Sequence, residues 1–170
     1  MKRAYLVVGA ESSGTRMLTS ILIAGGCTGS PEHFQPYDRN PPTADRIVWR
    51  RSIPHAGTLP QIGDMAKYLE GLGYVVTAIF ITRDWHATIH SQLKGAQHAK
   101  TAADAVQNIV NAYAYSLAQF VDHQMTFIVV SYEQIVYSDL GTRILLKMLD
   151  LDETAELPKL YNGNLPYYKI

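Results

Sequence analysis

The sequence has little of several things that mark other classes of protein. It contains one cysteine in 170 residues, which is too few for an internal disulfide or a cysteine-based metal cluster. No apolar run approaches the roughly 18 residues of a membrane-spanning helix. Fifteen basic residues balance 15 acidic ones. This neutrality argues against general binding to nucleic acid or to an anionic membrane, which usually requires a basic protein.

A secretory signal is also missing, although the first residues imitate one. Met1-Lys2-Arg3 precedes an apolar stretch, but that stretch ends at Glu11 and no small-residue cleavage site follows it. We therefore expect a cytoplasmic protein. The length suits one domain, since a single hydrophobic core commonly serves about 100–200 residues. The 47% of hydrophobic residues is enough to build that core.

Hydrophobic patterning alternates between strands and helices along the chain. Short continuous apolar runs, typical of strands buried on both faces, lie at residues 5–8, 47–49, 74–82 and 127–130. Helices are expected from Gly14 to the Gly25-Gly26 stop and over 59–72, 84–94, 101–120 and 138–149. The alternation predicts an α/β protein. We expect a three-layer α/β/α domain over 1–170, with a mainly parallel sheet and a turn-rich tail from about 152 to 170.

Three expected loops follow strands and carry polar or basic residues, namely 9–16, 50–55 and 82–91. The second contains Arg50-Arg51, placed by the pattern at the end of its strand, and the proline-rich segment 27–45 reads as a further loop. Ligands of open α/β sheets bind beyond the carboxyl ends of the strands. We therefore expect the functional site at that edge of the sheet.

The first of these loops has the spacing of a phosphate-binding loop. Gly9 and Gly14 stand in a G-x-x-x-x-G arrangement between a buried strand and a helix, where backbone N–H groups bind phosphate. A nucleotide triphosphatase continues with Lys and Ser or Thr, whereas this chain has Thr15 and Arg16, so Mg²⁺-nucleotide chemistry is poorly supported. The residues expected to bind a 5′-phosphate are Ser12, Ser13, Gly14, Thr15 and Arg16. The alternative is a Gly- and Ser-rich turn that only caps a helix.

Three motifs occur in an order found in one enzyme family. Ser13-Gly14-Thr15 follows the first strand, Arg83 ends a later strand, and Ser91 lies eight residues beyond Arg83. Segment 130–135, Val-Ser-Tyr-Glu-Gln-Ile, contributes Tyr132. In these features the chain resembles the PAPS-dependent sulfotransferases over roughly residues 4–150. That family has a Ser-Gly-Thr 5′-phosphosulfate loop, a strand-end Arg and a Ser for the 3′-phosphate, and a late Tyr-Glu-Asp-Leu segment.

The resemblance implies a P-loop nucleotide-binding, sulfotransferase-like fold. It further implies PAPS as the sulfonate donor, no metal, and a small-molecule or glycan acceptor, without nucleic acid or membrane as a partner. Some family features are missing: Ser12 replaces the usual Lys or Arg, Met17 replaces a Trp that stacks on adenine, and the C-terminal Arg-Lys-Gly loop is absent. The chain is also short for this family. We infer a reduced core, an open site, or walls supplied by a partner subunit in a homo-oligomer.

Sulfonate transfer needs cations near the bridging oxygen and a base for the acceptor. Arg16, Arg50 and Arg51 are the expected cations. When the family's Lys-Thr-His-x-Pro stretch is aligned through Pro54, Ser52 stands where the catalytic His would be. His55 is in the same loop, and an imidazole suits proton abstraction near neutral pH. The other candidate bases are Glu32, His33 and Glu11.

Some residues support weaker hypotheses. His86 and His90 are four apart on an expected helix, a metal-compatible spacing, but no Glu lies between them and a solvated helix face is the better interpretation. Tyr161, Tyr167 and Tyr168 fit either an aromatic wall for the acceptor or a tail packed on the domain. Two other functions stay open, a P-loop nucleotide or small-molecule kinase with a degenerate loop, and a nucleotide-binding protein without catalysis.

Overall fold

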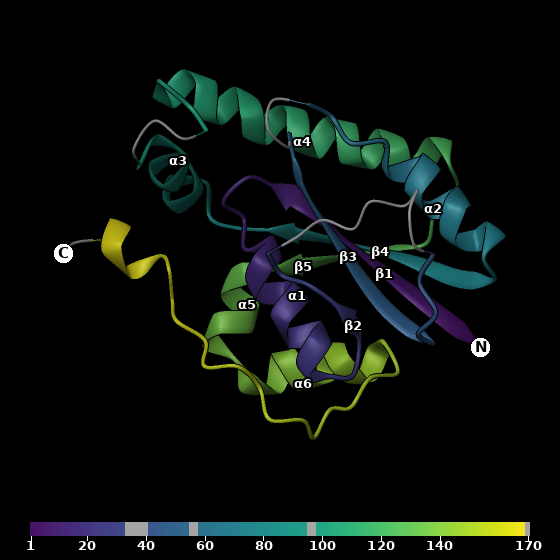
Figure 1. Ribbon diagram of the computed structural model, residues 1–170. Coiled ribbons are helices and arrows are strands. Elements are labelled where there is room, and N and C mark those ends of the chain that lie inside the picture. The colour runs from purple at the N-terminus through teal and green to yellow at the C-terminus, as the bar shows by residue number, and fades with distance from the viewer. Residues whose placement is uncertain (33–40, 55–57, 95–97, 169–170) are drawn as a thin grey trace.

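The computed structural model describes residues 1–32, 41–54, 58–94 and 98–168. These residues contain a five-stranded sheet with the strand order β2-β3-β1-β4-β5, and every neighbouring pair is parallel (Figure 1). The strands are β1 (Lys2–Ala10), β2 (Thr28–Gly29), β3 (Arg46–Ile53), β4 (Tyr74–Thr82) and β5 (Phe127–Ser131). The predicted α/β class is confirmed. The two-residue β2 lies in the segment that we expected to be a loop.

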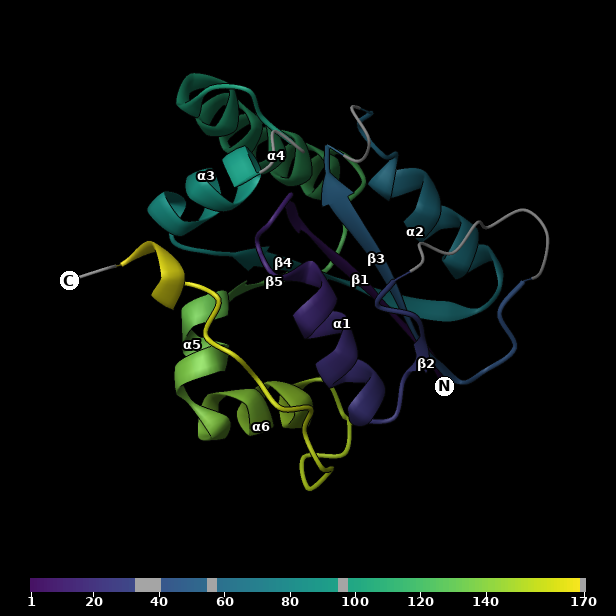
Figure 2. The ribbon, with the colours of Figure 1, turned by 60° about the vertical axis from the view of Figure 1, so that its left-hand side comes forward.

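Helices cover both faces of the sheet. One face carries α1 (Thr15–Ala24), α5 (Tyr132–Tyr137) and α6 (Asp139–Met148), and the other carries α2 (Ile62–Gly71) and α4 (Ala102–Asp122). Helix α3 (Trp85–Leu93) lies beside α4, and a short 3₁₀ helix, η2 (Leu165–Tyr167), is in the C-terminal tail (Figure 2). The result is a three-layer α/β/α arrangement. No helix in the described ranges is long and apolar enough to span a bilayer.

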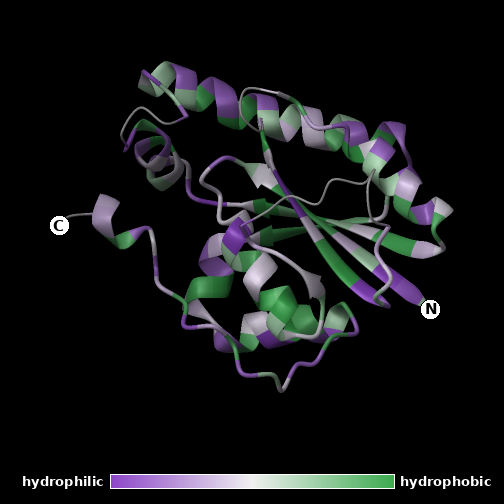
Figure 3. Cartoon of the chain, viewed as in Figure 1, coloured by the Kyte–Doolittle hydropathy of each residue, from purple (hydrophilic) through white to green (hydrophobic). Residues whose placement is uncertain are grey.

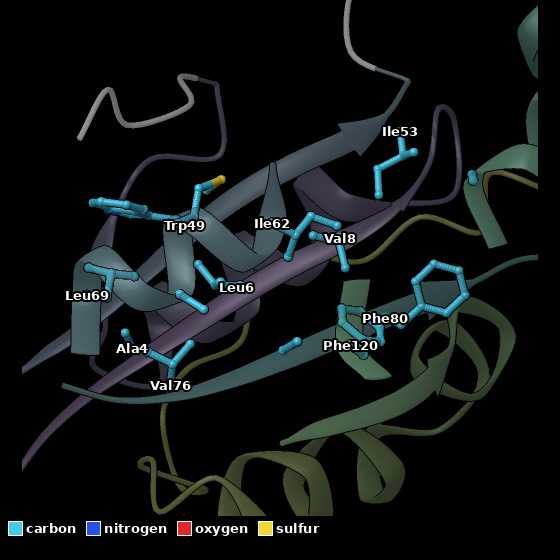
Figure 4. Packing of buried hydrophobic residues seen from close by; sticks show 14 of the residues in the cluster. Ala4, Leu6, Val8, Trp49, Ile53, Ile62, Leu69, Val76, Phe80 and Phe120 are labelled. Atoms are coloured by element: carbon cyan, nitrogen blue, oxygen red, sulfur yellow. The ribbon is translucent and has the colours of Figure 1, made fainter. Parts of the chain in front are cut away.

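Two hydrophobic cores lie on the two faces of the sheet, and β1 contributes to both. Leu6 and Val8 point toward α2 and α4, whereas Tyr5 and Val7 point toward α1 and α6, since successive strand residues face opposite sides. Figure 4 shows the first core, where Trp49 and Leu69 pack beside Leu6. Hydrophobic colour runs through much of the sheet, whereas the helices alternate between hydrophobic and hydrophilic residues (Figure 3). Burial on both faces explains why the strands read as continuous apolar runs.

Helix boundaries follow from side-chain caps at most starts. Thr101 and Asp104 form a reciprocal capping box at α4, which confirms the predicted cap. Ser138 caps α6 through the N–H of Gly141, and Asp84 caps α3 through the N–H of Ala87. Helix α1 differs because it begins after Gly14, which has no side chain to cap it.

The predicted end of the second strand is wrong. We placed Arg50-Arg51 in a loop after residue 49, but β3 continues to Ile53 and pairs Arg50 with Val7 and Arg51 with Val8. Both arginines are buried, so tertiary burial overrides the local signal that charged residues give. Because neighbouring strand residues face opposite sides, Arg50 lies on the α1 face and Arg51 on the α2 face.

Candidate functional site

The candidate site lies at the carboxyl ends of β1 and β4, where the direction of the chain connections changes. β1 leads to β3 on one side of the sheet and β4 leads to β5 on the other. The helices that follow, α1 and α4, therefore pack on opposite faces. This is the topological switch point at which open α/β sheets bind ligands. Residues 11–14 follow β1 here and Arg83 follows β4, as the sequence predicted.

Loop 11–14 presents the start of α1 to this edge. Ser12 and Gly14 have positive φ angles of 68° and 100°, and the N–H of Ser13 donates to the carbonyl of Ala10 at 3.0 Å. The first turn of α1 has neither a side-chain cap nor an acidic residue. Its N–H groups are therefore available to an anion.

Gly14 is required here for two reasons. Its φ of 100° is one that L-residues rarely adopt, and a Cβ at this position would lie 2.5 Å from the ring of Tyr132. The loop thus lies directly on the Tyr132 ring. The hydroxyl of Ser13 is buried among the strand ends and has no hydrogen-bond partner in the described part of the chain. Ser13 therefore presents only its backbone to the edge of the sheet.

Arg50 places a buried positive charge beside this helix start. Arg50 is 7% exposed. Its Nη1 lies 3.5 Å from Thr15 Oγ1, and its Nη2 lies 3.5 Å from the carbonyl oxygen of Glu32. Its buried Nε has no hydrogen-bond partner among the residues that the structure describes. Burial lowers the pKa of Arg50 and the positive charge of Arg16 lowers it further, while the negative charge of Glu32 opposes the shift.

The other predicted cations are placed differently. Arg16 is exposed and its Nη1 lies 3.4 Å from Glu32 Oε2, so a candidate cation and a candidate base form an ion pair. Arg51 is buried on the opposite face of β3 from Arg50. The structure therefore brings Arg16 and Arg50 together near Glu32 and does not add Arg51 to them.

Arg83 is held by both the loop and the C-terminal tail. Its Nη1 donates to the carbonyl of Ser12 at 2.7 Å, its Nη2 donates to the carbonyl of Gly163 at 2.8 Å, and its Nε donates to Asn164 Oδ1 at 2.7 Å. The guanidinium also lies 4.7 Å from the centre of the Tyr132 ring. Within the described ranges, three of its five N–H bonds are used, so two remain for a ligand. Ser91 lies in the second turn of α3 and is partly buried.

The C-terminal tail crosses the ends of β4 and β5. Asn164 is buried and joins Arg83 to Glu133 through its amide, which donates to Glu133 Oε1 at 2.8 Å. Tyr168 hydrogen-bonds to Asp84, and Tyr167 stacks on His90 with ring centres 5.9 Å apart. The tyrosines of the tail thus pack on the domain. His86 and His90, with ring centres 4.4 Å apart, lie against this tail.

Beside α1 the tail forms one wall of a cleft of about 270 Å³. Met17, at the position where the resemblance would place a stacking Trp, lines it together with Tyr132 and Tyr161. Lys159 also lines it, with its ammonium 5.4 Å from the centre of the Tyr161 ring. From α1, the cleft is lined by Met17 and Ser20.

A Glu–His pair at the same edge was missed by the sequence reasoning. Glu11 is buried, and its Oε2 lies 2.7 Å from Nδ1 of His98, whose side chain is 35% exposed. The buried Gln92 donates to the carbonyl of Glu11 at 2.9 Å, and Asn108 donates to the carbonyl of His98 at 3.1 Å. His98 precedes the cap of α4 and nothing in the local pattern links it to Glu11. His55 and His33 lie outside the described residues.

No protein-family model matches the chain, and no curated protein matches it. The case for a function therefore depends on the geometry of this site.

Proposed function

We propose that the chain is a PAPS-dependent sulfotransferase, with its donor bound at the switch point between β1 and β4. The observation that carries the proposal is the start of α1, where uncapped N–H groups adjoin a buried guanidinium with an orphaned Nε. Buried polar groups in folded proteins normally have partners, so an orphaned cationic donor beside a helix start favours an anionic ligand. The residues present fit the phosphosulfate end of PAPS.

If the phosphosulfate binds at the start of α1, the other groups of PAPS can be assigned to nearby residues. Arg83 would hold the 3′-phosphate with its two remaining N–H bonds, together with Ser91 of α3. The adenine would enter the cleft that begins at Met17 and Tyr161. Tyr132 would support the sites of both phosphates of the donor, since its ring contacts Gly14 in the loop and the guanidinium of Arg83.

The chain's residues can then assist transfer by charge and by proton removal. Bound PAPS supplies the sulfonate, whose sulfur–oxygen bond to the 5′-phosphate breaks as sulfur bonds to the acceptor oxygen or nitrogen. Arg50, Thr15 and the N–H groups of α1 would stabilise the negative charge that develops on the leaving phosphate. His98 would accept the acceptor's proton at Nε2, while Glu11 fixes the ring through Nδ1.

Among the candidate bases, the described geometry favours this pair. The carboxylate of Glu32 forms an ion pair with Arg16, so it is less available to accept a proton from the acceptor. Glu11 itself faces His98, so it acts through that ring rather than directly on an acceptor. His55 and His33 stay sequence predictions.

Mg²⁺-nucleotide chemistry has less support. Arg16 stands where a triphosphatase has the hydroxyl that binds Mg²⁺, and the guanidinium of Arg50 lies beside Thr15. A cation at that place would repel a metal ion.

Calorimetric titration with adenosine 3′,5′-bisphosphate tests the donor site. We expect binding in the wild type, at least tenfold weaker binding in Arg83→Ala, and a smaller loss in Ser91→Ala. Arg46→Ala is the matched control, because Arg46 is exposed at the opposite end of β3 and should leave affinity unchanged. Equal affinities in Arg83→Ala and Arg46→Ala would overturn the site, and preferential binding of Mg²⁺-ATP would support the kinase alternative.

Transfer of radiolabelled sulfonate from PAPS to hydroxyl and amine acceptors tests catalysis. His98→Asn keeps an N–H near the position of Nδ1 for Glu11 but removes the basic nitrogen, so turnover should fall at least tenfold while bisphosphate affinity stays unchanged. Bisphosphate binding with no transfer to any acceptor would favour a non-catalytic nucleotide-binding protein.

A further inference from the structure

Helix α4 lies on the outside of the molecule, with the sheet beneath it and no other helix above it (Figure 1, Figure 2). Its inner stripe packs on the sheet through residues Ala105, Ile109, Ala112, Ser116 and Phe120. The opposite side of such a helix is normally charged. Here no residue between Asp104 and Asp122 carries a charge. The outer side of α4 is therefore unusual for a surface in contact with water.

Four large apolar side chains form a stripe along one exposed flank of α4, about 110° around the helix from the inner stripe. The exposed fractions are 36% for Val106, 42% for Val110, 42% for Leu117 and 69% for Val121. The exposed Ala114 and Ala118 lie among them and leave room for another backbone to approach. We call these six residues the outer stripe of α4. A continuous apolar stripe of this kind indicates an interaction surface.

The spacing of the outer stripe is symmetric about the middle of the helix. Val106 and Val121 lie equally far from the midpoint between residues 113 and 114, and so do Val110 and Leu117. A two-fold axis through that midpoint would place Val106 against Val121 and Val110 against Leu117 of an antiparallel second copy. A two-fold interface needs such self-complementarity, because every contact between two different residues occurs twice, once in each direction.

The charges of α4 permit a second copy as the occupant, and the area of the helix sets the strength of the contact. Asp104 and Asp122 lie at the two ends of α4, so an antiparallel pair would bury no charge at its centre. A helix of 21 residues is about 31 Å long and about 10 Å wide, which gives roughly 300 Å² per protomer. Stable interfaces bury about 1,200–2,000 Å² in total, so this contact is a weak one.

We propose that the outer stripe of α4 is the contact surface of a reversible, concentration-dependent homodimer, with the two α4 helices antiparallel about a two-fold axis. This inference does not depend on the proposed catalytic function.

Sedimentation velocity over about 5–500 μM of the full chain tests the proposal. The wild type should shift from monomer toward dimer with rising concentration, and Val110→Glu combined with Leu117→Glu should stay monomeric. Val110→Glu combined with Leu117→Lys should restore association to within about threefold of the wild type, because residue 110 meets residue 117 of the second copy. In a parallel pair the same combination would set like charges opposite each other. Failure of this rescue would overturn the antiparallel arrangement.

A matched control is Ile144→Glu on α6, which is an equally exposed apolar residue elsewhere and should leave association unchanged. A wild type that stays monomeric at 500 μM would overturn the proposal, and so would loss of association in Ile144→Glu alone. Ala114→Cys gives a second test that tolerates weak folding effects. It should form a disulfide-linked dimer under mild oxidation. Lys147→Cys should not, because Lys147 is on α6 and outside the outer stripe. The native Cys27 should not interfere in either variant, since it is buried.

Discussion

Asn164→Ala should destabilise the protein by breaking the link between the tail and the ends of the two strands. Asn164 is 2% exposed and makes two hydrogen bonds to ionised groups, one from Arg83 Nε at 2.7 Å and one to Glu133 Oε1 at 2.8 Å. Hydrogen bonds to charged groups contribute about 1.5–3 kcal/mol each, but both partners are partly accessible to water. We therefore expect a loss of about 2–3 kcal/mol, less than the full sum.

Urea unfolding at pH 7 measures this loss, and thermal unfolding should show a midpoint lower by roughly 4–12 °C for a chain of this size. Asn111→Ala is a suitable control, since Asn111 is exposed on α4 and its bond to Gln107 is a surface contact. The control should change stability by less than about 0.5 kcal/mol. A loss below about 1 kcal/mol in Asn164→Ala would show that the Asn164 side chain does not stabilise the fold through Arg83 and Glu133.

The pH dependence of the same variant gives an independent test. Burial opposes ionisation of Glu133, yet hydrogen bonds from the Asp84 N–H, Asn164 and Ser131 outweigh it and lower its pKa. A carboxyl with a lowered folded pKa stabilises the fold above its unfolded value of about 4.3, and this stabilisation is lost as the pH falls through the folded pKa. The difference between wild type and Asn164→Ala should therefore shrink below about pH 4. A difference that stays constant would contradict the role of Glu133.

Three further predictions concern single groups. Gly14→Ala should cost at least 1 kcal/mol in urea unfolding, since it strains a φ of 100° and pushes against Tyr132; an unchanged midpoint would contradict this. Burial raises the pKa of Cys27 to about 12, and the residue is 5% exposed, so a thiol reagent at pH 8 should label it only on unfolding; rapid native labelling would refute its burial. The hydrogen bond to Asp84, with burial, raises the pKa of Tyr168 to about 12. Ultraviolet titration should show that pKa, and Asp84→Asn should return the pKa of Tyr168 toward 10. The stability that the bond between Tyr168 and Asp84 contributes is present below pH 10 and is lost as the pH approaches 12.

Local patterns were sufficient to predict most of the fold. Val7 and Ile79 lie in apolar runs because β1 and β4 are covered on both faces, and Thr101 with Asp104 marks the start of α4 because a capping box is a local structure. The end of β3 could not be found in this way. Arg50 belongs to the strand because its pairing with Val7 and its place beside Thr15 outweigh the local preference of a charged residue for a loop.

The candidate site was only partly predictable for the same reason. The loop before α1 and Arg83 at the end of β4 follow from strand–loop–helix order, which the sequence displays. The contacts of Asn164 with Arg83 and of His98 with Glu11 join residues far apart in the chain. No local period or spacing encodes such contacts, since they arise only when the sheet and the tail are assembled.

The parallel sheet has a further electrical consequence. Every strand ends at the same edge, so α1, α2, α3 and α5 all begin there, and each helix start carries about half a positive charge. These helix starts therefore add a fixed positive potential at the candidate site, although the chain has no net charge. An approaching anion is attracted toward this edge of the sheet before it makes contact, and dissolved salt weakens that attraction. The association rate of a small polyanion should thus fall with ionic strength, even though the protein as a whole is neutral.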